Sequence, residues 1–533
     1  MQRFCRCLWL GMALAALLAA CVSSPPESAT PGAPAAHAPA APARPGGTLV
    51  VATPNDPGQL NPGLTTAFGT HLVTGNIYSG LLQFDDKLQP QPNLAERWEV
   101  SPDGKTYTFF LRRNVTWHDG KPFTSADVAF SFEQVLLKYH ARTKAGLEKV
   151  LEAIDSPDAA TVVFRFKAPY APLLRRLDVV EAPILARHVY EGADVQRSEA
   201  NLKPVGTGPY KFAEYVKGDR VRLVRNASYF KPGLPLLDEV VFRIVPQSTT
   251  ALLALERGEV DYTTGVPGPE IARLARSTEL KLVKAPAGPG GSFCIEQLIF
   301  NLQRPPLDRL AVRQAVAHAI DRRRILEQVH FGQGRVASGP IASSMAWAYD
   351  PGVPQYAFRP AMAKELLGQA GVAQLAITFV HAPQFQKTAE VVRENLAEVG
   401  VSVQLKTLEV NAANEQIFVK KDFDLGIGSY CNGPDPEVGV TRAYASWNIG
   451  PIPFSNGSGY RNARVDQLFA QAAATVSEPA RAELYHEVQA QLVRDLPYLW
   501  LVETELFRAY RADVRDLRPW SGDLAERAWL EKR

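Results

Sequence analysis

The 533-residue sequence predicts a mixed α/β fold. Short stretches in which apolar and polar residues alternate, typical of half-buried strands, are interspersed along the chain with longer stretches of helical periodicity. Hydrophobic residues make up 46% of the chain and charged residues 21%, which indicates a folded globular protein rather than a disordered one. No internal repeat of about 20–50 residues is visible, which argues against a solenoid or a propeller.

Several stretches carry the strand pattern. Residues 48–53 (TLVVAT) form a short apolar run that is stopped by the turn-rich sequence PNDPG. Residues 101–113 begin with a turn and continue with alternating aromatic and polar side chains. Residues 161–167 (TVVFRFK) follow turn residues in the same way. We expect one strand in each of these three stretches.

Helix signals lie between the strands. Thr124 and Asp127 have the spacing of a capping box, so a helix should begin there. Residues 307–329 carry apolar residues at helical spacing and predict one long helix. Residues 386–399 are amphipathic, and Gly400 should end that helix before the next strand.

The N-terminus predicts export. Arg3 and Arg6 precede an apolar run of about 13 residues, which as a helix would reach roughly 20 Å and is too short to span the ~30 Å bilayer core. We therefore expect a signal peptide at residues 1–20. The following Leu-Ala-Ala-Cys sequence resembles the bacterial lipobox, in which the chain is cut before the Cys, here Cys21, and that Cys is lipidated. An ordinary signal peptide cleaved after Ala20 is the alternative.

A spacer should follow the cleavage site. Residues 22–46 contain seven Pro and eight Ala, a composition that cannot bury a core and favours an extended tether. Residues 21–46 would thus form a lipidated Cys and a Pro/Ala-rich tether. No later stretch has 18 consecutive apolar residues, so we expect no membrane-spanning helix after Cys21.

The five cysteines divide into groups. Cys5 and Cys7 would leave with the signal peptide, and Cys21 would carry lipid. Cys294 and Cys431 remain as an even pair in an oxidising compartment, which favours a disulfide. Two separate buried thiols are the alternative.

Catalytic and metal motifs are missing from the sequence. Gly104-Lys105-Thr106 imitates the end of a phosphate-binding loop, but Glu99 stands where that motif needs Gly. The nine histidines are scattered, and no nucleophile elbow or zinc-protease motif is present. A net charge of +3 lacks the basic excess that nucleic-acid binding needs. We expect a binding protein that is not an enzyme, without a cofactor or metal site and without a nucleic-acid partner.

Several segments resemble a known protein family. The most specific lies within residues 95–133 (AERW…SPDGKTYTFFLRRNVTWHDGKPFTSADVAFSFE). Further matches follow in the family's order at 60–62, 204–210, 226–230, 251–262 and 301–326. The chain is similar to family 5 extracytoplasmic solute-binding proteins, the dipeptide-, oligopeptide- and nickel-binding class that serves ABC importers.

The resemblance implies an architecture. It is the class II periplasmic-binding-protein fold, with two lobes and an extra domain in the first lobe, and a ligand enclosed between the lobes by hinge closure. Domain I would comprise 47–78, 204–283 and 500–533, domain II 79–203, and domain III 284–499. We expect a monomer on the periplasmic side of a bacterial membrane, held there by its lipid anchor.

The resemblance also implies a ligand loop at 428–439 (GSYCNGPDPEVG). In peptide-binding relatives an Asp of this motif pairs with the α-ammonium group of the peptide. Here Asn432 matches that position, or Gly433 if the alignment shifts by one residue, and neither carries a charge. Asp435 is the alternative ammonium anchor, unless it only caps the following turn. Ordinary peptides with a free amino terminus are therefore in doubt as ligands.

Other site residues follow from family positions. Ligand contacts are expected from Thr66, Phe68, Gly69, Trp347 and Tyr430. Arg442 and Asn456 flank the motif and would suit a carboxylate. In oligopeptide-binding relatives a Cys at the position of Cys294 pairs with a Cys in the ligand motif, which implies the Cys294–Cys431 bridge.

Three functions remain open at this point. The leading one is a membrane-anchored lipoprotein that captures a peptide-like or other small polar organic solute and delivers it to the permease and ATPase subunits of an ABC importer. A ligand sensor that signals to a membrane partner is the second. A nickel- or metallophore-binding protein is the third, and the scattered histidines argue against it.

Overall fold

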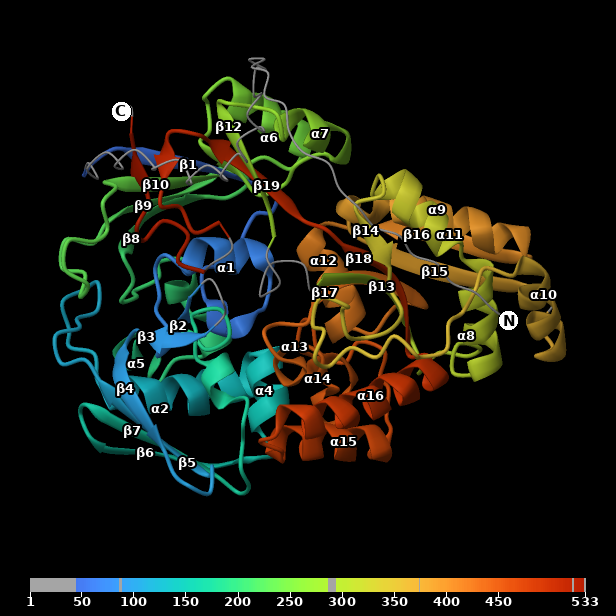
Figure 1. Cartoon of the computed structure of the whole chain (residues 1–533), viewed down its shortest axis with the longest axis horizontal. Helices are drawn as coiled ribbons and strands as arrows, with labels where there is room; N and C mark the ends of the chain where they lie inside the picture. The colour runs from blue at the N-terminus through green and yellow to red at the C-terminus, as the bar shows by residue number, and fades with distance from the viewer. Residues whose placement is uncertain (1–44, 86–88, 286–293, 373, 520–521, 532–533) are drawn as a thin grey trace, which may run out of the picture. The chain divides into compact units, whose positions relative to one another are not determined.

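The computed structural model describes residues 45–85, 89–285, 294–372, 374–519 and 522–531. The expected signal peptide, Cys21 and almost all of the tether lie outside these residues. The described chain confirms the mixed α/β fold, with its three larger sheets distributed over two lobes (Figure 1). In the described part, no helix is both long and apolar enough to cross a membrane.

The first lobe is built on a seven-stranded sheet in the order β12-β19-β11-β1-β10-β9-β8. Its strands are β1 (Thr48–Thr53), β8 (Tyr210–Val216), β9 (Arg220–Arg225), β10 (Glu239–Ile244), β11 (Tyr262–Thr263), β12 (Leu280–Lys284) and β19 (Phe507–Arg511). The expected strand at 48–53 is confirmed as β1, which pairs in parallel with β10 and β11. Because the strands come from three separate parts of the chain, this sheet forms only when distant segments meet.

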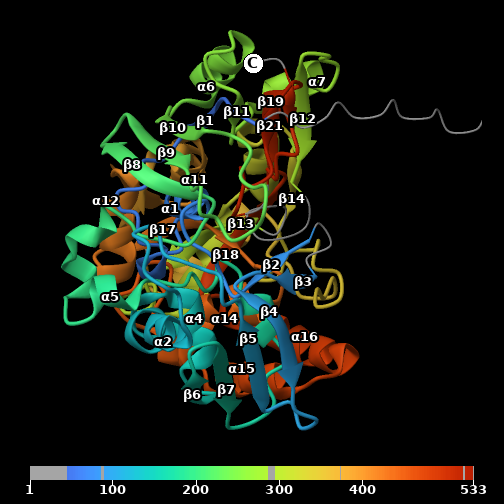
Figure 2. The ribbon, with the colours of Figure 1, turned by 90° about the vertical axis from the view of Figure 1, so that its left-hand side faces the viewer.

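Helices cover both faces of β1, as Figure 2 shows from a second direction. Leu49 and Val51 pack in one apolar cluster with Leu72 of α1 (Phe68–Thr74). Ala52, which points to the opposite face, packs with Leu252 of α6 (Ser248–Glu256). Coverage on both faces explains why this strand is apolar nearly throughout.

A four-stranded antiparallel sheet forms the extra domain of this lobe, in the order β4-β5-β7-β6. Its strands are β4 (Ala95–Val100), β5 (Thr106–Leu111), β6 (Leu151–Asp158) and β7 (Thr161–Phe166). The expected strands in 101–113 and 161–167 are thus confirmed. The predicted capping box also forms, with the Thr124 backbone N–H donating to Asp127 Oδ2 at 2.9 Å. It starts α2 (Ser125–Phe130), which continues as a π-helical turn at Ser131–Leu136.

The second lobe is built on a six-stranded sheet in the order β14-β18-β13-β17-β15-β16. Its strands are β13 (Cys294–Phe300), β14 (Gly334–Val336), β15 (Leu375–His381), β16 (Val401–Thr407), β17 (Leu425–Cys431) and β18 (Tyr498–Thr504). The chain returns to the first lobe between β18 and β19. The boundary expected between 499 and 500 falls inside β18, all of which belongs to this sheet, and the domain boundaries stay a prediction.

Helices complete both lobes, together with the short strand pairs β2–β3 (Leu82–Phe84, Pro90–Pro92) and β20–β21 (Val514–Arg515, Trp529–Leu530). Those of the first lobe are α3 (Leu137–Tyr139), α4 (Ala141–Leu147), α5 (Arg187–Tyr190) and α7 (Ile271–Leu274). Those of the second are α8 (Leu310–Ala319), α9 (Arg322–Arg324), α10 (Pro360–Gln369), α11 (Gln386–Glu398), α12 (Val410–Asn414), α13 (Pro436–Gly439), α14 (Thr441–Tyr444), α15 (Ala463–Ala474) and α16 (Glu478–Asp495).

One helix prediction is wrong. The chain does not form a single helix over 307–329, because α8 ends at Ala319 and Ile320 is extended, with φ −94° and ψ 121°. Asp321 then accepts a hydrogen bond from the Arg324 backbone N–H at 3.0 Å and caps a new helix. By contrast, the helix expected at 386–399 is confirmed as α11, and Gly400 follows it with φ 87°.

The two remaining cysteines are joined. Cys294 begins β13 and Cys431 ends β17, and the two are direct partners of this antiparallel strand pair, with their Cα atoms 3.8 Å apart. The structure links them by a disulfide, as the family resemblance implied. The bridge fixes the start of the 432–435 loop to the central strand of the second lobe.

Candidate functional site

A cavity of about 360 Å³ lies against α1, the 178–180 segment and the C-terminal segment around Arg518. Its lining includes Thr66 and Phe68 from the first lobe, and Cys431 is the contribution of the second lobe. A volume of this size is within the range of small-molecule sites.

Two of the predicted contact residues border this cavity. Thr66 Oγ1 accepts a hydrogen bond from Arg442 Nη1 at 3.0 Å. Phe68 is 37% exposed, and the Arg508 guanidinium lies 5.3 Å from the centre of its ring. Gly69 follows in α1, where an added Cβ would come within 3.1 Å of Asn55. The small size of Gly69 is therefore explained by close packing.

Asn432 is committed to the fold. Its side chain is 3% exposed, with Oδ1 accepting from the Ala342 backbone N–H at 2.7 Å and Nδ2 donating to the Pro340 carbonyl at 3.0 Å. Both polar ends of the amide are thus used to hold the 340–342 loop against β17. The Asn432 side chain therefore has a structural role, and a direct ligand contact by it stays a prediction.

Asp435 is fully buried and already neutralised. Its Oδ1 accepts from the Glu437 backbone N–H at 3.0 Å, which caps α13, and from Arg481 Nη2 at 2.7 Å. A second guanidinium, that of Arg175, lies 3.7 Å from Oδ2. Because two cations already face this carboxylate, it is poorly placed to pair with a ligand ammonium group.

Two of the three predicted aromatic residues, Tyr430 and Trp347, are not among the residues that line the cavity. Tyr430 is buried in the core of the second lobe, where its ring lies edge-on to Tyr498. Trp347 packs edge-on against Tyr485, and the Arg481 guanidinium lies 5.1 Å from the centre of the Trp347 ring. Ligand contact by these residues stays a prediction.

Asn456 also has a structural role. Its Nδ2 donates to three backbone carbonyls, and its Oδ1 accepts from the backbone N–H groups of Gly459 and Tyr460 and from the Ser458 hydroxyl. Because every polar atom of its side chain is engaged by the end of α14 or by residues 458–460, Asn456 has no free group for a carboxylate.

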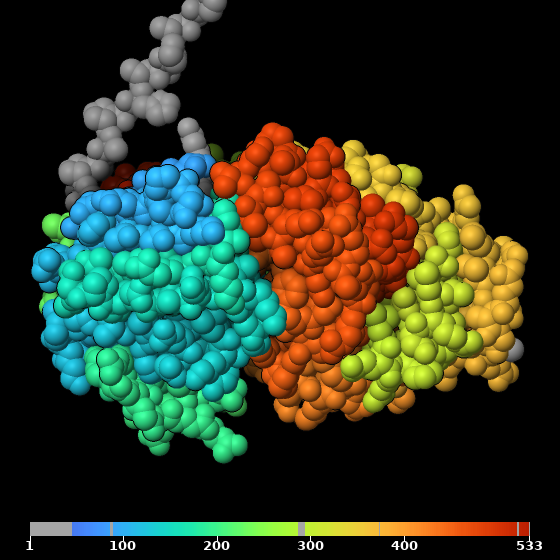
Figure 3. All heavy atoms as spheres, turned by 90° about the horizontal axis from the view of Figure 1, so that it is seen from below, coloured from blue at the N-terminus to red at the C-terminus, as the bar shows by residue number. Residues whose placement is uncertain are grey.

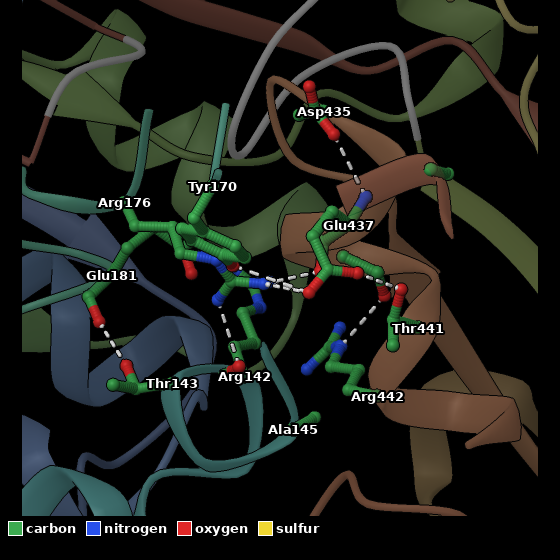
Figure 4. A network of polar contacts seen from close by, with 12 residues as sticks. Arg142, Thr143, Ala145, Tyr170, Arg176, Glu181, Asp435, Glu437, Thr441 and Arg442 are labelled. Carbon is green, nitrogen blue, oxygen red and sulfur yellow. Dashed lines mark hydrogen bonds and ion pairs between the residues drawn. The ribbon is translucent and has the colours of Figure 1, made fainter. Parts of the chain in front are cut away.

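Several residues that join the two lobes were missed by the sequence analysis. Arg176 from the first lobe donates to the backbone carbonyl of Glu437 in α13, and its guanidinium lies 3.4 Å from the Glu437 carboxylate (Figure 4). The Tyr170 hydroxyl donates to the same carboxylate at 3.3 Å. Only the adjacent arginines at 175 and 176 hint at this site, and nothing in the sequence pairs them with a residue 261 positions away.

Further hydrogen bonds hold the lobes together. Trp447 Nε1 donates to the Ala145 carbonyl at 2.8 Å, and Arg175 Nη1 donates to the Pro434 carbonyl at 3.2 Å. Figure 3 shows the four-stranded region and the α15–α16 region meeting along a seam. The lobes are therefore in contact, as in a closed binding protein.

Burial shifts the pKa values of groups at this junction. It raises the pKa of the Glu437 carboxyl to about 7 against the opposing pull of Arg176. It lowers the pKa of the Arg442 guanidinium to about 9, and the neighbouring Arg142 charge lowers it further. Burial likewise lowers the pKa of His71, which lines the cavity, to about 4.

Comparison with known proteins identifies the family. Residues 89–451 match the family model "Bacterial extracellular solute-binding proteins, family 5 Middle". The chain belongs to this family. Family 5 consists of extracytoplasmic solute-binding proteins rather than enzymes.

Individual relatives extend the match over most of the chain. Di/tripeptide-binding protein 1 of Pseudomonas aeruginosa is 28% identical over 502 residues, covering 88% of this chain and 91% of the relative. The solved structure of DppA from Helicobacter pylori in complex with peptide STSA is 28% identical, with a TM-score of 0.84 over 92% of this chain and 99% of its own. That of AgaA from A. tumefaciens in complex with agropinic acid is 26% identical, with a TM-score of 0.83 over 91% and 99%.

Proposed function

We propose that this family 5 protein captures a small peptide-like or other polar organic solute and delivers it to the permease and ATPase subunits of an ABC importer. The observation that carries the proposal is the cavity of about 360 Å³, lined by residues of both lobes. A relative named for di- and tripeptides supports a peptide-like solute, and a neighbour solved with agropinic acid supports another polar organic solute.

The proposed site is the part of the cavity that is lined by Thr66 and Phe68 of the first lobe and by Cys431 of the second. A ligand here would touch both lobes and so would stabilise their closed arrangement. We also propose that Cys21 anchors the protein on the periplasmic side of the membrane. We retain the three-domain division, with the last boundary moved from 499/500 to the end of β18.

Native mass spectrometry of the protein purified without denaturation tests the proposal. We expect an added mass of a few hundred daltons that is released on unfolding and identifies the solute class. Uptake of that solute should then fall in cells that lack the gene and return when the gene is restored. A bound nickel–chelator complex would instead favour metallophore capture, and normal uptake without the gene would contradict a role in import.

A further inference from the structure

Arg442 in α14 is a buried cation whose contacts are all neutral. Its side chain is only 2% exposed. Nε donates to the Gly439 carbonyl at 3.1 Å and Nη1 to the Thr66 hydroxyl at 3.0 Å, while the guanidinium lies 5.1 Å from the centre of the Tyr430 ring. Within the part of the chain that the structure describes, this guanidinium makes no ion pair with a carboxylate. A buried charge without a counter-ion is costly, so its retention needs an explanation.

The carboxylates around Arg442 are engaged elsewhere. Glu181 pairs with Arg142. Glu437 accepts from Arg176, as Figure 4 shows beside Arg442. Arg142 even retains a buried Nε without a hydrogen-bond partner among the described atoms. Arg142 is thus paired with Glu181, whereas Arg442 has no carboxylate partner among the described residues. This end of the site is short of negative charge.

Charged residues of both signs line the cavity, the acidic ones including Asp85, Asp523 and Glu526, and the buried arginines lie at one end of it. Thr66, His71 and Arg142 all line it, and Arg442 reaches it through its hydrogen bond to Thr66. Asp178, another lining residue, is only partly ionised at neutral pH because burial raises its pKa to about 7. The charge of Arg142 also helps to keep the pKa of His71 low, after the larger effect of burial.

We infer that the ligand carries a carboxylate, which binds between Arg442, Thr66 and Arg142 at this end of the cavity. The inference rests on the proposed function and narrows its solute class to small organic anions. Neither Asn432 nor Asp435 is free to bind a ligand ammonium group. The Asn432 side chain is hydrogen-bonded to the 340–342 loop, and Asp435 already faces two arginines. A free ammonium group is therefore not required of the ligand.

Calorimetry with dipeptides in four chemical forms tests the inference. Dialanine and alanyl-phenylalanine would each be titrated free, N-acetylated, C-amidated, and with both ends blocked. We expect the forms with a carboxylate to bind at least about 10-fold more tightly than the matching amides, with or without the acetyl group.

Variants locate the group that is responsible. Arg442→Gln should weaken binding of the carboxylate forms by about 10- to 100-fold, the scale of a charge-assisted hydrogen bond, and change binding of the amides by less than about threefold. Arg442→Lys should keep part of the preference because it keeps the charge. The matched control is Arg323→Gln, which removes an exposed arginine that pairs with Glu327 on the surface. If Arg442→Gln fails to fold, Thr66→Val tests the same contact and should reduce the preference for carboxylates.

The outcomes separate the two claims. Equal affinity of the wild-type protein for carboxylate and amide forms would overturn the inference and leave the proposed function intact. A preference for carboxylates that survives in Arg442→Gln would overturn the role of Arg442. Failure of every form to bind would overturn peptide-like capture, and the inference with it.

Discussion

Replacing Asn432 with Asp should destabilise the fold, although the family resemblance led us to expect an Asp at or next to this position. Asn432 Nδ2 donates to the Pro340 carbonyl at 3.0 Å. A carboxylate oxygen in place of Nδ2 would face the Pro340 carbonyl oxygen, and two acceptors cannot form a hydrogen bond. The site is buried, since the Asn432 side chain is only 3% exposed. Loss of the hydrogen bond and burial of an unsatisfied charge together should lower the free energy of unfolding by about 3 kcal/mol at pH 8.

The effect should depend on pH. The introduced carboxyl has an unfolded-state pKa of about 3.9, and burial raises its folded-state pKa. Below about pH 4 both states are protonated, and the neutral acid donates to Pro340 as the amide does, so the destabilisation should vanish. It should grow by about 1.4 kcal/mol per pH unit above that, reaching about half its full value at pH 5 and levelling off near pH 6.

Chemical denaturation of wild type and variant at pH 5 and pH 8 measures this. Asn432→Ala is the control, because it removes the same amide without adding a titrating group, and its destabilisation should be equal at both pH values. An Asn432→Asp variant as stable as wild type at pH 8, or one equally destabilised at both pH values, would refute the reasoning.

Three further predictions follow from the structure and the N-terminal sequence. Replacing both Cys294 and Cys431 with Ser should cost about 4–5 kcal/mol in the free energy of unfolding, because the bridge closes a loop of 137 residues; equal stability under non-reducing conditions would contradict this. Burial, and then the nearby Glu181 charge, raises the pKa of Asp178 to about 7, so ionising Asp178 between about pH 4 and pH 7 destabilises the fold. In the wild type, ionisation of Asp178 should lower the free energy of unfolding by about 1.4 kcal/mol per pH unit between pH 5 and pH 7, and Asp178→Asn should remove this loss. The same pH dependence in wild type and variant would show that Asp178 ionises normally. Cys21→Ser should move the protein from the membrane fraction to the soluble fraction and abolish palmitate labelling, whereas labelling that persists would exclude Cys21 as the lipid site.

Local signals predicted many of the secondary elements correctly. The start of α2 depended on a hydrogen bond between Thr124 and Asp127, three residues apart, and that bond is present. The end of α11 depended on Gly400 alone, whose positive φ is accessible to glycine without strain. Such features are decided by neighbours along the chain, so the sequence is sufficient to find them.

The same reasoning failed where local signals competed. Apolar periodicity over 307–329 continues through Ile320, but the Asp321 side chain caps a new helix there and interrupts the hydrogen-bond ladder. Periodicity describes which face of an element is apolar. It does not show whether a side chain will accept a backbone N–H hydrogen bond in place of a backbone carbonyl and so start a new helix.

The sequence by itself predicted the family and the mixed α/β class, and through the family resemblance the pairing of Cys294 with Cys431, because family segments are a property of the chain alone. Only the tertiary structure decided what the polar residues of the ligand loop do. Asn432 holds the 340–342 loop, Asp435 faces two arginines, and Arg442 is buried without a carboxylate partner among the described residues. The free energy of a buried polar or charged group depends on desolvation and on its partners, and these partners lie tens to hundreds of residues away along the chain.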